Sequence, residues 1–450
     1  MAINPASARS AKFLEGNLLK HVTAMSLTAS IGLMAVFVAD LANMLFISML
    51  ARPELTAAVG YGGTVMFLVV SFGIGLSVAA GALVSIAVGK RDELETKQRT
   101  THTTILGFAF GTLVAVCAWA TLPFMVSALG ATGEVYHQTM LFLIITIIST
   151  PFLCAGMVGG AVLRAHGDAR RSMTSTLVGA AVSIVLNPIL ILWLDWGLVG
   201  AAIATVVSRI AIVYVALWQV HRYYGGFIRT NWAAMKADIR PIRVIAVPAI
   251  LAQIATPIGF AFVTRIMSRF GEAAIAGMAI TGRLTPVAFG VIFALAGAVG
   301  PILGQNYGAK RFDRLREGFN ASLIFSGIVV IVVSALLFVL RGPIADAFHA
   351  EGLTREIIYL FCGPLALLWF FIAIIFVANA AFSTLGKPFT ATWTNWVRST
   401  IGTIIPVWIG AEMGGAIGAM WGQSITGVIF GILAYFLAVR LINNLQTRKV

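Results

Sequence analysis

The sequence predicts an all-α integral membrane protein with twelve transmembrane helices in two pseudo-symmetric six-helix lobes around a central cleft. Three observations predict this class: the composition, a series of long apolar segments, and an internal repeat. Of the 450 residues, 59% are hydrophobic and only 11% are charged, whereas about 25% are charged in soluble domains. The mean hydropathy is +0.94. So little charge excludes a soluble enzyme, a secreted scaffold and a disordered chain.

The apolar segments are each long enough to cross a bilayer, which takes about 20 residues. They lie at 22–50, 56–89, 101–129, 135–163, 172–194, 196–220, 244–268, 273–305, 318–340, 356–385, 389–411 and 414–438. Several are longer than a crossing requires, so those helices should tilt or extend past the membrane surface. Because the alternation of apolar and polar residues that is typical of membrane β-barrel strands is absent, we expect helices throughout.

The basic residues are distributed unequally between the loops. With twelve spans, both termini and the even-numbered loops share one side, which holds 23 of the 31 Lys and Arg residues, and the opposite side holds five. The positive-inside rule therefore places both termini of this multi-pass protein in the cytoplasm, and we expect it in the bacterial inner membrane. The net charge of +14 indicates topology and affinity for membrane lipid, and we expect no nucleic-acid partner.

An internal repeat relates the two halves of the chain. Three landmarks recur 218 or 219 residues apart: Gly81–Gly89 as Gly300–Gly308, Leu163–Asp168 as Ser383–Lys387, and Gly197–Ala202 as Gly415–Met420. Each repeat holds an even number of spans, so the halves have the same orientation and a pseudo-two-fold axis along the membrane normal. We predict an N-terminal lobe (1–220), a cytoplasmic basic linker (221–243) and a C-terminal lobe (244–450).

These landmarks resemble the multidrug and toxic compound extrusion (MATE) family over residues 20–440. The resemblance rests on Gly81 to Gly89, Gly300 to Ala309, Leu163 to Arg170, and Leu186-Asn187-Pro188 followed by Gly197 to Ala202. It implies a secondary active antiporter, not an enzyme, that exports organic compounds by alternating access in exchange for protons or sodium ions. The implied substrates are small, cationic and amphiphilic. We expect a monomer without cofactors.

Asp40 is the only one of the 17 acidic residues that lies deep within a predicted span. Helical spacing brings Asn43 and apolar side chains onto its face. Ionisable residues inside a membrane are costly, which makes them candidates for function. Apolar surroundings disfavour the charged form of a carboxylate, so Asp40 is suited to carry a proton, although it could equally attract sodium or a cationic drug. The resemblance implies a functional acid at the same place.

The resemblance also implies a polar network around Asp40. Archaeal relatives of the DNA-damage-inducible F (DinF) branch carry a second acid where this chain has Asn187. The network here would consist of Asp40, Asn43, Ser183, Asn187 and Thr205, with one ionisable member. Spans 7 and 10 lack the acids of the sodium-coupled NorM branch, which favours the DinF-like branch and proton coupling. Hydrogen bonding between helices is the alternative role for the neutral residues.

The expected substrate pocket draws on both lobes. Aromatic and methionine side chains suit a pocket that repacks around different drugs, although packing in the core or against lipid is the alternative. We predict Phe37, Met44, Tyr61, Gln253, Phe260 and Arg283. Arg283 could hold an anion there. Otherwise Arg209, Arg283 and Arg398, the three basic residues within spans, should reach a helix end or cap a carbonyl.

Other classes fit the sequence less well. Gly89-Lys90 is followed by Arg91, so no Walker A motif supports ATP-driven transport. The three cysteines lie in apolar stretches and predict neither a disulfide framework nor a metal site. An intramembrane enzyme would need a second catalytic partner for Asp40. The closer alternatives are a sodium-coupled version of the same antiporter and a lipid-linked oligosaccharide flippase of the same superfamily.

Overall fold

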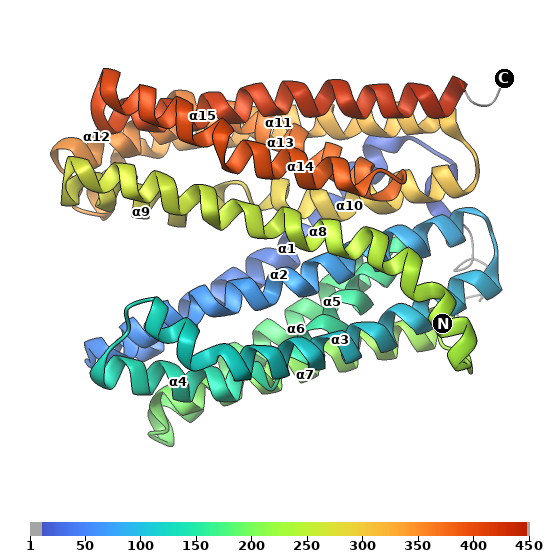
Figure 1. The fold of residues 1–450 in the computed structure, drawn as a ribbon, viewed down its shortest axis with the longest axis horizontal. Coiled ribbons are helices and arrows are strands. Elements are labelled where there is room, and N and C mark those ends of the chain that lie inside the picture. The colour runs from blue at the N-terminus through green and yellow to red at the C-terminus, as the bar shows by residue number, and fades with distance from the viewer. Residues whose placement is uncertain (1–10, 448–450) are drawn as a thin grey trace. The chain divides into compact units, whose positions relative to one another are not determined.

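The computed structural model describes residues 11–447, and over that range it consists of helices joined by short turns (Figure 1). The first eight α-helices are α1 (Leu18–Ser48), α2 (Pro53–Gly89), α3 (Glu93–Ala128), α4 (Gly133–Ile147), α5 (Thr150–Ala165), α6 (Ala169–Pro188), α7 (Gly197–Tyr224) and α8 (Trp232–Met267). The others are α9 (Glu272–Ala288), α10 (Gly290–Gly308), α11 (Phe312–Ala347), α12 (Gly352–Leu360), α13 (Ala366–Thr384), α14 (Pro388–Ser399) and α15 (Ile401–Thr447). The two termini, which the charge pattern predicts to be cytoplasmic, lie outside the described range.

The spans of this range agree with the predicted twelve. Ten helical stretches between residues 11 and 447 are long and apolar enough to cross a membrane, and the bent pair of α4 and α5 adds one more. The stretch Pro388–Thr447 is two spans, because non-helical Gly414 and Gly415 interrupt it. Thr426 Oγ1 donates a 2.6 Å hydrogen bond to Gly402 O, atoms that a continuous helix would hold about 36 Å apart. The chain therefore folds back at these glycines.

The backbone shows the repeat directly. Six pairs of residues with positive φ have members 218 to 220 positions apart: Ala51 and Gly271, Arg91 and Lys310, Gly130 and His349, Gly133 and Gly352, Gly167 and Gly386, Gly197 and Gly415. A left-handed residue after a helix turns the chain away from the helix axis. The same succession of helices and turns therefore occurs twice, including at positions where the side chains differ, such as Arg91 and Lys310.

The described chain forms two compact units. Unit 1 comprises residues 11–12 and Ile31–Ile250, and unit 2 comprises Phe13–Ser30 and residues 251–447. The divisions after residues 30 and 250 fall within α1 and α8, each of which is the first helix of a repeat. Within 221–243, predicted as a linker, only residues 225–231 are not helical. The rest completes α7 and begins α8.

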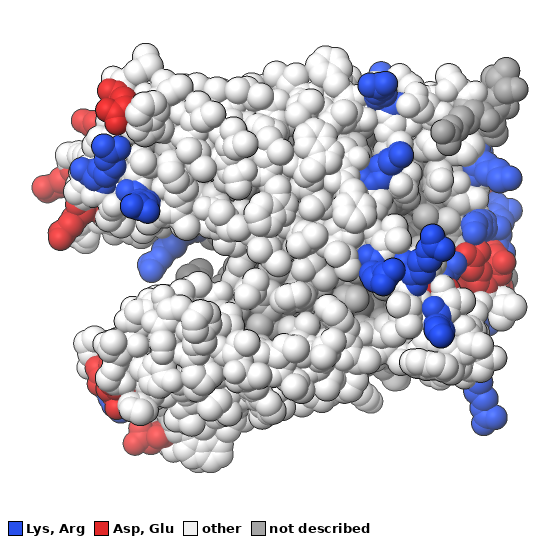
Figure 2. Space-filling view, in the orientation of Figure 1, with Lys and Arg blue, Asp and Glu red and all other residues white. Residues whose placement is uncertain are grey.

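Glycine allows the helices of unit 1 to pack closely. A Cβ at Gly111 of α3 would lie 2.8 Å from Pro151 Cα of α5, and one at Gly107 would lie 3.2 Å from Val158. These small residues let the backbones of α3 and α5 approach closely, as is typical of helix association in membranes. On the face drawn in Figure 2, most charged side chains lie toward the ends of the helices.

Candidate functional site

The height of Asp40, meaning its position along the helix axis, follows from the packing of α1 against α6. A Cβ at Gly32 would collide with Thr176 Oγ1, and one at Gly197, after α6, would lie 3.8 Å from Leu50 Cδ1. The two helices therefore run parallel, and both rise about 1.5 Å per residue. Interpolation between these contacts places Asp40 at the height of residues 184–187 of α6.

Helix α7 runs antiparallel to α6 and brings Thr205 to the same height. Ser208 Oγ donates a 2.8 Å hydrogen bond to Gly179 O, and a Cβ at Gly200 would lie 2.6 Å from Leu190 O. Thr205 therefore lies opposite residues 183–185. The structure thus gathers at one height of unit 1 the predicted group Asp40, Ser183, Asn187 and Thr205.

The hydrogen bonds of this group are incomplete. Asn187, which is 1% exposed, donates a 3.1 Å hydrogen bond from Nδ2 to Ser183 Oγ. Thr205 Oγ1 donates to Ala201 O of its own helix at 2.9 Å. Among the described residues, the buried amide oxygens of Asn187 and Asn43 have no hydrogen-bond partner. An unpaired buried acceptor costs about 1–3 kcal/mol, so both oxygens are suited to a proton-bearing group or a cation.

Asp40 itself is exposed, whereas its neighbour Ala39 is buried. Protein atoms nevertheless surround the carboxyl closely enough to desolvate it, as the sequence predicts, while part of the residue stays accessible. Across residues 11–447 the side chain of Asp40 has no hydrogen-bond or ion-pair partner within bonding distance. An exposed carboxylate can be reached by a proton or a solute, which an enclosed one cannot without a conformational change.

Arg209 of α7 supplies the opposite charge at this site. Its guanidinium interacts electrostatically with Asp40, and its Nη1 donates a 2.8 Å hydrogen bond to Ser149 Oγ, which precedes α5. Arg209 thus reaches the N-terminal end of α5, one of the two roles that the sequence predicts, and it does so through a side-chain hydroxyl and not a carbonyl. In the sequence only its position in an apolar segment marked it as unusual.

The predicted pocket residues divide equally between the two units. Phe37, Met44 and Tyr61 are half-buried in unit 1, and Tyr61 packs against the buried cluster that contains Ile47. In unit 2, Gln253 is half-buried, whereas Phe260 and Arg283 are exposed. A pocket built from both sets stays a prediction.

Comparison with known proteins agrees with the transporter class that the fold and this site define. The chain matches the MatE family over residues 28–189 and again over 248–409. The chain therefore belongs to the MatE family, whose members are transporters and not enzymes.

Individual relatives are distant but match over nearly the full length. The multidrug export protein MepA of Staphylococcus haemolyticus is 24% identical over 447 residues, covering 97% of both chains. The FAD transporter of Shewanella oneidensis is 25% identical and covers 93% of both. The fold is similar to the solved structure of an outward-facing multidrug resistance MATE family transporter of the MOP superfamily, with a TM-score of 0.91, 21% identity, and coverage of 97% of this chain and 99% of that one.

Proposed function

We propose that this chain is a multidrug efflux antiporter that exports cationic, amphiphilic compounds in exchange for protons, with Asp40 as the coupling residue. The observation that carries the proposal is the position of Asp40, an exposed carboxylate within span 1 at the height of unpaired amide oxygens and in the field of Arg209. The multidrug export protein MepA, a relative along almost the whole chain, supports drugs as substrates.

The exchange follows from competition for one carboxylate. When Asp40 is ionised, its negative charge attracts a cationic solute, and Arg209 balances part of that charge. When Asp40 takes up a proton, the attraction for the cation disappears and the acid O–H needs an acceptor, for which the Asn43 and Asn187 oxygens lie at the right height. Because proton and drug are bound in alternation, an inward proton gradient drives the drug outward by alternating access.

The neutral residues support this exchange without titrating. Ser183 holds the Asn187 amide, so Asn187 Oδ1 has a fixed direction. With a single ionisable residue in the network, one proton per cycle is the simplest stoichiometry. Phe37, Met44, Tyr61, Gln253, Phe260 and Arg283 would contact the substrate. The DinF-like branch, a monomeric state and an inner-membrane protein with cytoplasmic termini belong to the same proposal.

Efflux from proteoliposomes tests the proposal. The purified protein is reconstituted, loaded with a fluorescent organic cation, and driven separately by a pH gradient and by a sodium gradient. We expect efflux with the pH gradient alone, and its loss in Asp40→Asn. Efflux that requires a sodium gradient and does not respond to a pH gradient would contradict proton coupling and indicate that Asp40 couples sodium.

The same assay decides the substrate class. Absence of efflux for every organic cation, with translocation of a lipid-linked oligosaccharide, would favour the flippase. Since one relative is an FAD transporter, FAD is included as an anionic solute. Export of FAD in place of cations would contradict the proposed charge of the substrate.

A further inference from the structure

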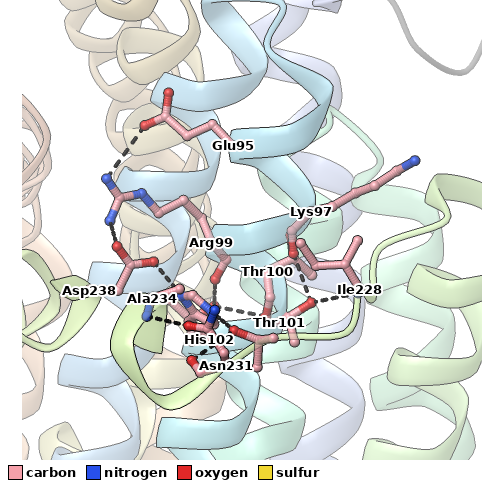
Figure 3. Close-up of polar contacts among 12 residues, drawn as sticks. Glu95, Lys97, Arg99, Thr100, Thr101, His102, Ile228, Asn231, Ala234 and Asp238 are labelled. Carbon is pink, nitrogen blue, oxygen red and sulfur yellow. Dashed lines mark hydrogen bonds and ion pairs between the residues drawn. The ribbon is translucent and has the colours of Figure 1, made fainter. Parts of the chain in front are cut away.

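A second polar cluster in unit 1 joins α3 to the segment that enters α8 (Figure 3). We call Arg99, His102, Thr230 and Asp238 the Asp238 cluster. Both carboxylate oxygens of Asp238 are paired: Arg99 Nη1 donates to Oδ1 at 2.5 Å, and His102 Nδ1 lies 2.6 Å from Oδ2. The other ring nitrogen, His102 Nε2, lies 2.5 Å from Thr230 Oγ1.

This cluster is buried, although its members are polar. His102 has no exposed surface and Asp238 is 7% exposed. Ionised groups lose their hydration on burial and are retained only where opposite charges and hydrogen bonds replace it. Arg99 also reaches Glu95 Oε1 at 3.5 Å, so the guanidinium faces two carboxylates. Removing Asp238 would leave Arg99 and His102 without their shared partner.

A neighbouring contact holds the connecting segment 225–231 on the same face of α3. Thr101 Oγ1 accepts a 3.1 Å hydrogen bond from Ile228 N and lies 3.4 Å from Gly226 O. Gly226 is packed closely, since a Cβ there would lie 2.6 Å from Val220 Cγ1. The backbone of the segment is therefore held on α3 by the Thr101 hydroxyl, and the first turns of α8 are held there by Asp238.

The hydrogen-bonding roles of the two His102 ring nitrogens give the Thr230 hydroxyl a specific role in the Asp238 cluster. A carboxylate accepts hydrogen bonds, so the proton of a neutral His102 lies on Nδ1, toward Asp238. Nε2 is then an acceptor, and the Thr230 hydroxyl is its donor. A hydroxyl at position 230 is needed for this arrangement, and the methyl group of the threonine is not.

We propose that Asp238 and His102 are positioning residues for transport, which hold the first turns of α8 on α3 throughout the cycle. Residues 232–250 then move as part of unit 1, the unit to which they belong. Any bending of α8 is then confined to the part of the helix after residue 250, where Pro257 weakens the helix. The proposal rests on transport by this family alone and does not depend on the role of Asp40.

Hydrogen–deuterium exchange tests whether the contacts of the Asp238 cluster persist throughout the transport cycle. The full-length protein in lipid nanodiscs is measured with and without a saturating fluorescent cation, at acidic and neutral pH. We expect the amides of 226–240 to be protected equally in all states, while other parts of the protein change. Loss of protection over 226–240 in any state would show that the contact opens during the cycle, which would overturn the proposal.

Variants separate positioning from a merely structural role. Asp238→Asn should raise exchange over 226–240 by about tenfold or more and lower the maximal transport rate, with an unchanged substrate affinity in equilibrium binding. Lys236→Gln, an exposed neighbour on α8, should change neither quantity. Wild-type exchange and transport rate in Asp238→Asn would contradict the proposal.

Should Asp238→Asn fail to fold, position 230 provides the same test. Thr230→Val should act as Asp238→Asn does, in a milder form, and Thr230→Ser should restore wild-type exchange and rate. Equal behaviour of the serine and valine variants would overturn the role of the hydroxyl. Asp40→Asn distinguishes this proposal from the proposed function, because it should abolish proton-driven efflux and leave exchange over 226–240 unchanged.

Discussion

Arg209 on α7 interacts electrostatically with Asp40 on α1, while a 2.8 Å hydrogen bond to Ser149 Oγ fixes its guanidinium. The proposed coupling acid thus has a positive charge held beside it by a third helix. A cation binding to Asp40 is repelled by Arg209, and a proton is repelled as well. In the proposed mechanism, Arg209 would therefore weaken the binding of either ligand to Asp40.

Replacing Arg209 should shift the pH dependence of efflux. In Arg209→Gln the opposite charge beside Asp40 is lost, so the carboxylate takes up a proton at lower proton concentration. We expect the pH profile of efflux to move to more alkaline values, whereas Arg209→Lys should keep most of the wild-type profile. The measurement is efflux rate against pH in proteoliposomes, and identical profiles for Arg209→Gln and wild type would contradict the role of this residue.

Removing the Asn187 amide should weaken coupling more than stability. Asn187→Ala removes the donor to Ser183 and the unpaired acceptor together, so the net loss of folding free energy should be about 1 kcal/mol. Proton-driven efflux should fall several-fold, because the proton on Asp40 loses an acceptor. Ser183→Ala keeps the Asn187 oxygen but frees the amide to turn, so it should lower efflux less than Asn187→Ala does. If both variants transport at the wild-type rate, the polar group serves packing alone.

Protonation of His166 should limit stability in acid. His166 lies between α5 and α6, and burial lowers its pKa below the ordinary 6.5, against smaller opposing effects of the Val162 carbonyl and Asp168. The unfolded chain therefore binds the proton more readily than the folded one. The contribution of His166 is complete above pH 6.5 and is lost as the pH falls below it. The thermal midpoint should decline less below pH 6.5 in His166→Gln than in wild type, and parallel declines would contradict this assignment.

Adding a methyl group at the fold-back of α15 should destabilise unit 2. A Cβ at Gly418 would collide with the carbonyl oxygen of Gly410, which is backbone and cannot rotate away. We expect Gly418→Ala to lose about 3 kcal/mol or more. Thermal unfolding in detergent measures this. Gly60→Ala is the control, since a Cβ there has nothing within 4 Å, and equal midpoints for the two variants would show that the fold-back is looser than described.

The sequence was sufficient for the fold and for the place of Asp40 within the first span. Apolar length and charge placement predict the spans, because the bilayer imposes both requirements segment by segment. The repeat predicted Gly167 with Gly386 and Gly197 with Gly415, and the backbone at those positions is left-handed in both copies. Asp40 was found because one acid in an apolar segment is costly wherever the segment packs.

Partnerships between distant residues could not be predicted in the same way. His102 and Asp238 lie 136 positions apart, and each taken alone is an ordinary polar residue near a helix end. The interactions of Arg209 with Asp40 and Ser149 depend on how α7 lies relative to α1 and α5, which the sequence does not show. The exposure of Asp40 likewise depends on which side of α1 its neighbours cover. Periodicity defines a face of a helix, whereas tertiary packing decides what that face meets.

Proton release on drug binding tests the central claim most directly. The purified protein in weakly buffered detergent solution is mixed with a saturating organic cation, and a pH indicator reports the protons released. The account predicts release of up to about one proton per protein in wild type, since a single carboxylate exchanges proton for drug, and none in Asp40→Asn. Equal proton release from wild type and Asp40→Asn would show that another group carries the proton.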